Sequence, residues 1–277
     1  MTISIITVNR NNREGLHKTI KSVLQQTECP YEFIVIDGAS TDGSADLLKE
    51  YHEQITYSVS EPDNGIYNAM NKGVTAASGD YLLFVNSGDR LISPDALERI
   101  SPYLDGTDII SGKMKYDNGE EMYADKNLSL LYFFKRSLPH CSTFIKADLL
   151  KTNPYNENLK IVSDWQFFLE SIVLNNCTFS IIDEYVAIFE GGGISARNNY
   201  IGDAERRLVL SSLFPDRVLI DYLQFTQGKG YVNTSYDIFY RKLRDYRLGK
   251  LIYRMNLIIV RGVGLLRKSF RWAWKIA

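Results

Sequence analysis

Polar side chains that could bind a charged ligand follow two apolar runs near the start of the chain. Asp37 comes directly after the run FIVI, and Asn86 and Asp89 come just after the run YLLFV. If the two runs are neighbouring parallel strands, their carboxylates meet at the carboxyl edge of one sheet, where open α/β sheets bind ligands. Two carboxylates at that edge suit a nucleotide-sugar that carries a metal ion on its diphosphate.

Each of these loops also has a simpler interpretation. Asp37 could bind a nucleotide base or ribose, or it could stand in a strand-end turn while Asp42 or Ser44 caps the next helix. At the second loop, Mg²⁺ or Mn²⁺ would bridge Asp89 to a diphosphate and neutralise the charge of the departing group. The alternative is a tight turn, because Asn, Ser, Gly and Asp all favour turns.

The segment EPDNGIYNAMNKG, residues 61–73, lies between the two loops. Asp63 and Asn64 would stand at the N-terminal edge of a helix, where backbone N–H groups favour an anionic ligand. Asn71 and Lys72 lie further along and could reach a ribose or a phosphate. The alternative is a capped amphipathic helix that binds no ligand.

Strand-like and helix-like segments alternate through the first hundred residues. This alternation, with continuous apolar strands, predicts an α/β fold whose parallel sheet is covered by helices on both faces. After about Pro94 the alternation becomes less regular. The expected strands are residues 4–8, 32–36, 55–59, 81–85, 107–116, 142–145 and 186–189; the expected helices are residues 14–26, 44–54, 66–77, 163–174 and 203–213, with an amphipathic segment at 128–134.

Length and composition are those of an ordinary globular protein. The 277 residues allow one large or two modest domains, and they are 45% hydrophobic and 23% charged. No apolar run reaches the ~18 residues that span a bilayer, and no signal peptide is expected. The three cysteines, Cys29, Cys141 and Cys177, match neither a disulfide framework nor a zinc site. These features predict a protein of the reducing cytoplasm.

The charge is distributed unevenly along the chain. From Tyr236 onward there are 11 Lys/Arg against 2 Asp/Glu, whereas the remainder carries 21 against 31. The acidic body argues against nucleic acid as a ligand. The basic segment interleaves cations with aromatic and aliphatic residues, which predicts a helical segment on an anionic membrane surface. A homo-oligomer interface, or a helix packed on the body, is the alternative.

Four strings in order, SIITVNRNN, IVIDGASTDGS, EPDNGIYNAMNKG and LLFVNSGD, resemble a known family. The chain is similar to family-two glycosyltransferases with the nucleotide-diphospho-sugar transferase (GT-A) fold. More narrowly, it resembles the bacterial capsule, O-antigen and colanic-acid transferases that contain EPDxGIYxAMNKG and NxGD. The resemblance covers the first two hundred residues or so and implies a mostly parallel central sheet covered by helices.

The resemblance implies roles for the strand-end residues. The loop after the first strand, from Thr7 to Asn9, would hold the nucleotide together with the first acidic loop, and Asp37 would bind the uracil side of a UDP-sugar. The implied donor-binding residues are Thr7, Asn9, Asp37, Asp63, Asn64, Asn71, Lys72, Asn86 and Ser87.

The family's metal motif is usually Asp-x-Asp, often followed by a further Asp. Here Asn86 and Gly88 stand at the two Asp-x-Asp positions, so Asp89 alone keeps a carboxylate. The resemblance therefore implies Mn²⁺ or Mg²⁺ at Asp89. The two replaced acids also motivate an alternative, a scaffold subunit of a glycan-assembly complex that keeps the fold with weak or no catalysis.

Two later segments resemble the acceptor side of the family. His140 in LPHCSTF would donate to a phosphate or line the acceptor pocket, or it would be a structural hydrogen-bonder. Asp164 in IVSDWQ resembles the catalytic base, which accepts the proton of the acceptor hydroxyl; a helix N-terminal carboxylate is the alternative. Trp165 would be a platform for sugar stacking. The segment EGGGIS, residues 190–195, resembles a loop near the donor, or it is a plain glycine turn.

The predicted function is transfer, with inversion, of a hexosyl or N-acetylhexosaminyl group from a nucleotide donor, expected to be UDP-linked, to a hydroxyl of a bacterial surface glycan. The acceptor is expected on a polyprenyl diphosphate, with the protein peripheral on the cytoplasmic face of the cell membrane. Residues 1–100 are predicted to bind the nucleotide-sugar, residues 101–215 the acceptor, and residues 216–277 to form the basic amphipathic extension. A sugar-1-phosphate nucleotidyltransferase is disfavoured, because residues 9–13 (NRNNR) contain no glycine for a phosphate-binding loop.

Overall fold

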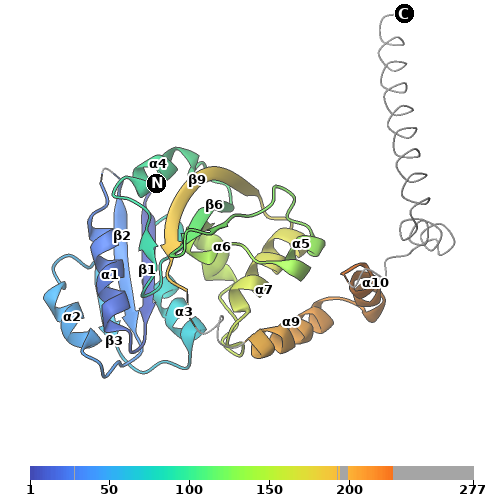
Figure 1. Ribbon diagram of the computed structural model, residues 1–277, viewed down its shortest axis with the longest axis horizontal. Coiled ribbons are helices and arrows are strands. Elements are labelled where there is room, and N and C mark those ends of the chain that lie inside the picture. Colours follow the sequence, from blue (N-terminus) through green and yellow to red (C-terminus); the bar gives the residue numbers. More distant parts are fainter. Residues whose placement is uncertain (28, 192, 194–198, 227–277) are drawn as a thin grey trace, which may run out of the picture. The chain divides into compact units, whose positions relative to one another are not determined.

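The apolar runs form one mixed β-sheet that is covered by helices (Figure 1). The computed structural model describes residues 1–27, 29–191, 193 and 199–226. Among these residues nine strands make the sheet in the order β3-β2-β1-β4-β8-β6-β9-β5, with β7 paired to β6. The strands are β1 (Ile3–Asn9), β2 (Tyr31–Asp37), β3 (Tyr57–Ser60), β4 (Tyr81–Phe84), β5 (Arg90–Leu91), β6 (Ile109–Tyr116), β7 (Glu121–Met122), β8 (Thr143–Lys146) and β9 (Phe179–Phe189).

The first four strands are parallel, as the sequence predicted. β1 pairs with β2 on one side and with β4 on the other, and β2 pairs with β3. β1 is buried along its whole length, and so is β4. Strands this apolar are stable only when both faces of the sheet are covered.

Helices cover those two faces. On α1 the buried Leu16 and Ile20 pack into the same core as Ile3 of β1. α3 packs on β1 and β2, with Gly73 directly against Ile6. Because Ile3 and Ile6 point to opposite faces of the strand, the two helices lie on opposite faces of the sheet. The helices are α1 (Arg13–Leu24), α2 (Ser44–Glu50), α3 (Ile66–Ala76), α4 (Ala96–Ile100), η1 (Ser101–Tyr103), α5 (Leu130–Lys135), η2 (His140–Ser142), α6 (Ala147–Thr152), α7 (Ser163–Leu169), η3 (Glu170–Leu174), α9 (Asn199–Leu213) and α10 (Asp216–Thr226).

The second half of the sheet departs from the expected pattern. β8 is antiparallel to both β4 and β6, and β5 is antiparallel to β9, which itself runs parallel to β6. β9 begins at Phe179, where only residues 186–189 were expected, because several of its side chains are exposed or half-buried and hide the strand pattern. The helix expected at residues 163–174 is α7 followed by one π-helical segment, η3.

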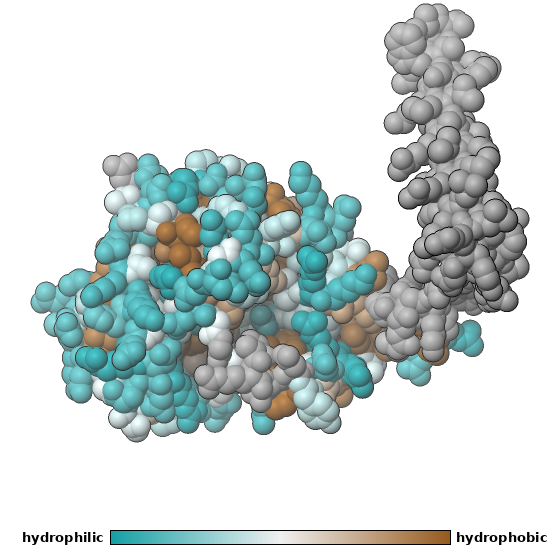
Figure 2. All heavy atoms as spheres, viewed as in Figure 1, coloured by the Kyte–Doolittle hydropathy of each residue, from teal (hydrophilic) through white to brown (hydrophobic). Residues whose placement is uncertain are grey.

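The chain divides into two compact units, Met1–Leu213 and Phe214–Ala277. The basic segment from Tyr236 onward, with its expected membrane contact, lies outside the described residues. Within the part that is described, no helix is both long enough and apolar enough to cross a membrane. Cys29, Cys141 and Cys177 are free thiols. The face drawn in Figure 2 is largely hydrophilic over the first unit, with separate small apolar patches.

Candidate active site at the carboxyl edge of the sheet

Strand pairing brings the two predicted loops to one edge of the sheet. Asn9 and Asp37 are register neighbours at the ends of β1 and β2. After β4, the N–H of Ser87 donates to the carbonyl of Val8 at 3.2 Å, so Asn86 and Ser87 lie beside the end of β1. The two loops therefore meet, as the order of the strands predicted.

Asp37 is the central acceptor at this edge. It is 0% exposed, and its carboxylate accepts from Asn9 Nδ2 at 2.7 Å, from the Ser60 hydroxyl at 2.6 Å and from the backbone N–H of Ser40 at 2.9 Å. The buried Thr7 donates its hydroxyl to the carbonyl of Val85, directly after β4, at 2.6 Å. In contrast, Asn9 Oδ1 is buried and has no hydrogen-bond partner among the described residues. Asn9 Oδ1 is therefore a buried acceptor that a ligand at this edge could satisfy.

Asp63 lies against the first loop. Its side chain is 4% exposed, accepts a backbone hydrogen bond at 2.9 Å and lies 3.5 Å from Arg10. A Cβ on Gly38 would overlap Asp63 Oδ2, so the glycine allows the carboxylate to approach the residues that follow Asp37. Asn64 is exposed beside it. Asp63 and Asn64 thus belong to the same edge as Asp37.

Asn71 and Lys72 have partners within the protein. Lys72 Nζ lies 2.6 Å from Glu61. The amide of Asn71 donates to the carbonyl of Tyr155 at 2.9 Å and to Glu157 at 2.8 Å, and its Oδ1 accepts from the N–H of Tyr155 at 3.0 Å. Asn71 therefore holds the segment around Tyr155, and its predicted reach to a ribose or a phosphate stays a prediction.

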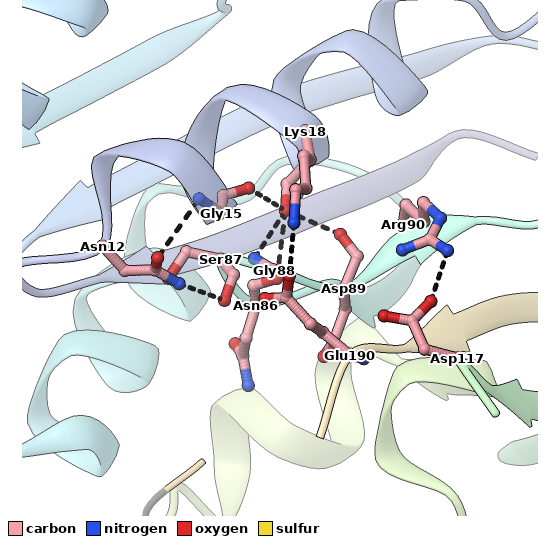
Figure 3. A network of polar contacts seen from close by, with 11 residues as sticks. Asn12, Gly15, Lys18, Asn86, Ser87, Gly88, Asp89, Arg90, Asp117 and Glu190 are labelled. Carbon is pink, nitrogen blue, oxygen red and sulfur yellow. Dashed lines mark hydrogen bonds and ion pairs between the residues drawn. The ribbon is translucent and has the colours of Figure 1, made fainter. Parts of the chain in front are cut away.

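Side chains of α1 fix the second loop (Figure 3). Asn12 caps the first turn of α1 and donates to the carbonyl of Ser87 at 3.1 Å. The buried hydroxyl of Thr19 donates to the carbonyl of Asp89 at 2.6 Å and accepts from the N–H of Gly88 at 3.0 Å. The conformation of residues 86–89 is therefore set by the helix that follows β1.

Asp89 is buried on this loop. It is 6% exposed, and burial raises the pKa of its carboxyl group to about 7. Its Oδ1 accepts from the N–H of Glu190 at 3.2 Å, and the Glu190 side chain forms an ion pair with Lys18 of α1 at 2.5 Å (Figure 3). A carboxyl group in such surroundings favours either a proton or a bound cation.

The residues at this loop fit a divalent metal ion. Asn86 Oδ1 is buried and has no hydrogen-bond partner among the described residues, and it belongs to the same loop as the Asp89 carboxylate. The described residues contain no group of three or more His, Cys, Asp or Glu side chains that could hold a metal. Mg²⁺ sites commonly use only one or two carboxylates, with phosphates and waters supplying the other oxygens. A metal here would take most of its ligands from a diphosphate and from water.

Asp164 lies in the first turn of α7, and its Oδ1 accepts from the hydroxyl of Tyr67 on α3 at 2.8 Å. Its charge also acts on His140, Tyr155 and Arg206. Burial lowers the pKa of Arg206, and Asp164 opposes that shift. The carboxylate therefore has one hydrogen bond, from Tyr67, and its charge reaches three further groups that can act as donors.

His140 makes a structural hydrogen bond, one of its two predicted roles. Its ring stacks on Phe84 of β4, with centroids 4.8 Å apart and an interplanar angle of 18°. Nε2 lies 2.8 Å from the hydroxyl of Tyr155. Burial lowers the pKa of His140, which favours the neutral imidazole. Its predicted contact with a phosphate or an acceptor stays a prediction.

The two acids border one segment of chain. Phe84, just before the second loop, stacks on His140, and His140 in turn feels the charge of Asp164. Cys141, the next residue, feels the charge of Asp89, although burial is the main reason that its thiol pKa is raised. The charges of Asp89 and Asp164 thus each act on a residue of η2, so both carboxylates lie near that segment.

Trp165 is a core residue, and this contradicts its predicted role as a sugar-stacking platform. It is 1% exposed, its Nε1 donates to the carbonyl of Phe133 at 2.8 Å, and the Arg206 guanidinium lies 5.0 Å from its ring centroid. Its ring is one of the largest fully buried side chains of the described residues, as are those of Phe133 and Phe168, which leaves no face open to a sugar.

Sequence reasoning missed two residues that organise the site, Tyr67 and Thr19. Tyr67 stood inside the segment 61–73, but its contact is with a residue 97 positions away, which no local pattern reveals. Thr19 carried a weak signal, since it is a polar residue on the buried stripe of α1 with Leu16 and Ile20. Glu190 begins the predicted loop 190–195, but the local sequence gives no sign of its contact with Asp89.

Comparison with known proteins identifies the family of the chain. A family model described as Glycosyl transferase family 2 matches residues 4–153. The chain belongs to this family. An uncharacterized glycosyltransferase of Mycobacterium tuberculosis is 34% identical over 182 residues, which are 62% of this chain and 70% of that protein. A PGL/p-HBAD biosynthesis glycosyltransferase of the same organism is 29% identical over 232 residues, covering 78% of this chain and 88% of that one.

The solved structures show the fold of this family 2 glycosyltransferase. S. aureus TarS, residues 1–349, superposes with a TM-score of 0.63 at 21% identity, over 87% of this chain and 74% of that one. Its complex with UDP-GlcNAc gives 0.59 at 23% identity, over 70% of this chain and 59% of that one. Glucosyl-3-phosphoglycerate synthase from M. tuberculosis, bound to Mn²⁺ and UDP, superposes with a TM-score of 0.54 at 16% identity, over 76% of this chain and 79% of that one. The chain is a glycosyltransferase enzyme with the GT-A fold, as predicted.

Proposed function

We propose that this enzyme transfers a hexosyl or N-acetylhexosaminyl group from a UDP-sugar to a hydroxyl of a bacterial surface glycan, with inversion at the anomeric carbon. The observation that carries the proposal is the position of Asp164. Its carboxylate accepts from the Tyr67 hydroxyl and lies near η2, as does that of Asp89. A candidate base and a candidate diphosphate site close to one segment suit a displacement at the anomeric carbon.

The donor is proposed to bind at the carboxyl edge of the sheet. Asn9 Oδ1 is a buried acceptor that has no donor from the described residues, and a uracil N–H would supply one. Asp37 would act by holding Asn9, while Asp63, Asn64 and the backbone near Ser87 border the same edge. Complexes of TarS with UDP and with UDP-GlcNAc support a uridine nucleotide as the donor.

In the proposed reaction, Asp164 accepts the proton of the acceptor hydroxyl while the oxygen of that hydroxyl attacks the anomeric carbon. The bond from that carbon to the UDP oxygen breaks, and the electron pair leaves with UDP. One displacement inverts the configuration, and no covalent glycosyl-enzyme forms. His140, neutral and half-buried, is proposed to border the sugar or the phosphate between the two acids.

Mn²⁺ or Mg²⁺ is the proposed cofactor, held by Asp89 with Asn86 Oδ1 and the diphosphate. When bound, such an ion neutralises charge on the departing diphosphate. Structures of M. tuberculosis glucosyl-3-phosphoglycerate synthase and of a Pyrobaculum calidifontis mannosyltransferase that contain Mn²⁺ support this assignment.

The acceptor is proposed to be lipid-linked, on a polyprenyl diphosphate at the inner face of the cell membrane. The basic composition of the segment from Tyr236 onward supports this proposal. Sedimentation of the full chain with phospholipid vesicles tests it. Binding to anionic but not to neutral vesicles, reversed by salt, is expected; equal sedimentation with both would contradict it.

The enzymatic test measures UDP release from a panel of UDP-hexoses and UDP-N-acetylhexosamines with a mixture of lipid-linked acceptors. Asp164→Asn should lower turnover by about 10²–10⁴-fold. Asp148→Asn is a matched control, because Asp148 is also an acidic residue in a helical first turn, that of α6, and is exposed. If Asp164→Asn is as active as the parent, Asp164 is not the base.

A scaffold without activity is the competing proposal, and Asn86 and Gly88 at the two acidic positions favour it. Calorimetry with UDP, with and without Mn²⁺, separates the two proposals. Binding of UDP that strengthens with Mn²⁺ supports the transferase. Absence of binding in both conditions would support the scaffold.

A further inference from the structure

Tyr67 connects the donor half of the enzyme to Asp164. It lies in the first turn of α3, directly after the segment with Asp63 and Asn64, and it is 5% exposed. Its hydroxyl donates to Asp164 Oδ1 at 2.8 Å. Burial, and then the charge of Asp164, raise the pKa of Tyr67 well above its usual value, so the hydroxyl keeps its proton and remains a donor.

The same helix also holds the segment that carries Tyr155. Asn68 and Asn71, three residues apart on one face of α3, both donate to the carboxylate of Glu157 at 2.8 Å. Asn71 pairs with the backbone of Tyr155 in both directions, and the Tyr155 ring lies 5.5 Å from that of Tyr67. α3, which carries Tyr67, is therefore bonded to the segment around Tyr155 and Glu157 at several points.

The two oxygens of Asp164 differ in their surroundings. Oδ1 accepts from Tyr67, whereas no hydrogen bond joins Oδ2 to any other described residue. A carboxylate at the start of a helix would otherwise rotate about its χ2 bond, because terminal torsions of this kind have broad minima. The bond to Tyr67 removes that freedom and leaves one defined oxygen to receive a proton.

We propose that Tyr67 is a positioning residue, which fixes Asp164 Oδ1 so that Oδ2 faces the acceptor hydroxyl. This inference rests on the proposed role of Asp164 as the base. By this proposal, α3 has two roles. It follows the segment with Asp63 and Asn64 at the proposed donor site, and it sets the geometry of proton transfer through Tyr67. Misplacing a reacting group by about 1 Å can cost on the order of a hundred-fold in rate.

Steady-state kinetics of UDP release test the inference with four proteins: the parent, Tyr67→Phe, Asp164→Asn and the double variant. Tyr67→Phe should lower kcat by about ten- to a hundred-fold and leave the KM for the donor within about two-fold. The double variant should be no slower than Asp164→Asn alone, because Tyr67 acts only through Asp164. A tyrosine that merely supported the fold would instead add its loss to that of Asp164→Asn.

Tyr81→Phe is the matched control. Tyr81 is 1% exposed, and its hydroxyl bonds to the carbonyl of Thr107 at 2.7 Å at the start of β4, the end opposite the site. It should lose stability with little change in kcat. If Tyr67→Phe does not fold, Tyr67→Met provides the test, because a flexible apolar side chain fills the position without a donor.

The outcomes separate this inference from the proposed function. Parental kcat in the folded Tyr67→Phe variant, or an additive loss in the double variant, overturns the positioning role while Asp164→Asn remains inactive. If Asp164→Asn is itself as active as the parent, Asp164 is not the base, and both the proposed function of Asp164 and the positioning role of Tyr67 are wrong.

Discussion

The backbone N–H of Glu190, at the end of β9, donates to the carboxylate of Asp89, 101 residues earlier in the chain, at 3.2 Å. The Glu190 side chain extends from there to Lys18 of α1, and a Cβ on Gly88 would overlap its Oε2. Asp89 is therefore held from two directions, by α1 through Thr19 and by β9 through Glu190. Removing either contact should weaken binding at the proposed metal and diphosphate site.

The titration of Asp89 predicts a dependence of stability on pH. Burial raises its pKa from the ordinary 3.8 to about 7, so the folded state binds this proton more tightly than the unfolded state. The stabilising effect of protonation is complete below about pH 4 and is lost as the pH rises to about 7. Without metal, the free energy of unfolding of the parent should fall between pH 5 and pH 8 by roughly 2–3 kcal/mol more than that of Asp89→Asn.

Urea unfolding of both proteins in EDTA at several pH values measures this difference. The comparison with Asp89→Asn cancels the groups that the two chains share. Parallel pH profiles would show that Asp89 does not titrate in this window. Added Mn²⁺ with UDP should reverse the trend in the parent, since a metal binds the charged carboxylate, and should not do so in Asp89→Asn.

Gly88 is expected to be essential because of the space that it leaves for Glu190. Gly88→Ala must accept a left-handed backbone, at φ 106°, which costs about 1–2 kcal/mol, and must also displace the Glu190 side chain. Gly106→Ala is the control, because Gly106 has φ 100° and nothing within 4 Å of an added Cβ. Both variants should lose similar stability by thermal denaturation. Calorimetry with UDP and Mn²⁺ should show weaker binding for Gly88→Ala alone; equal binding in the two variants would contradict the role of Glu190.

Thr19→Val should loosen the second loop from α1. The change keeps the shape of the side chain but leaves the N–H of Gly88 and the carbonyl of Asp89 without their buried partner. Each unpaired group costs about 1–3 kcal/mol, so stability to urea should fall by about 2–6 kcal/mol, and UDP should bind more weakly. Thr19→Ser restores the hydroxyl and should recover most of the UDP affinity. If both variants bind like the parent, the loop does not depend on this contact.

The first half of the fold was predictable because its strands are buried on both faces and end at polar loops. The apolar runs before Asp37 and Asn86 identified β2 and β4, and parallel pairing then required their loops to meet. β5 and β7 escaped prediction because they contain two residues each, and β9 because its side chains are only partly buried. For such strands the pairing partner, rather than the local sequence, determines the structure.

The site follows the same division. Local sequence marked the acids, since Asp37 and Asp89 follow strands and Asp164 begins a helix. It could not mark Tyr67, whose role depends on where α7 lies relative to α3. Asn71 and Trp165 were assigned to ligands because amides and aromatic rings suit sugars, but the same groups also satisfy buried backbone and fill cores. Side-chain chemistry alone does not separate these uses.

Trp165→Phe tests whether Trp165 is a core residue or a platform for sugar stacking. The smaller ring removes the donor to the Phe133 carbonyl and part of the surface under Arg206. An unpaired buried carbonyl costs about 1–3 kcal/mol, so the free energy of unfolding in urea should fall by about that amount. The KM for the glycan acceptor should stay close to that of the parent, because a ring that is 1% exposed has no face for a sugar. A large rise in the acceptor KM with unchanged stability would restore the stacking role and would require that α7 opens when the acceptor binds.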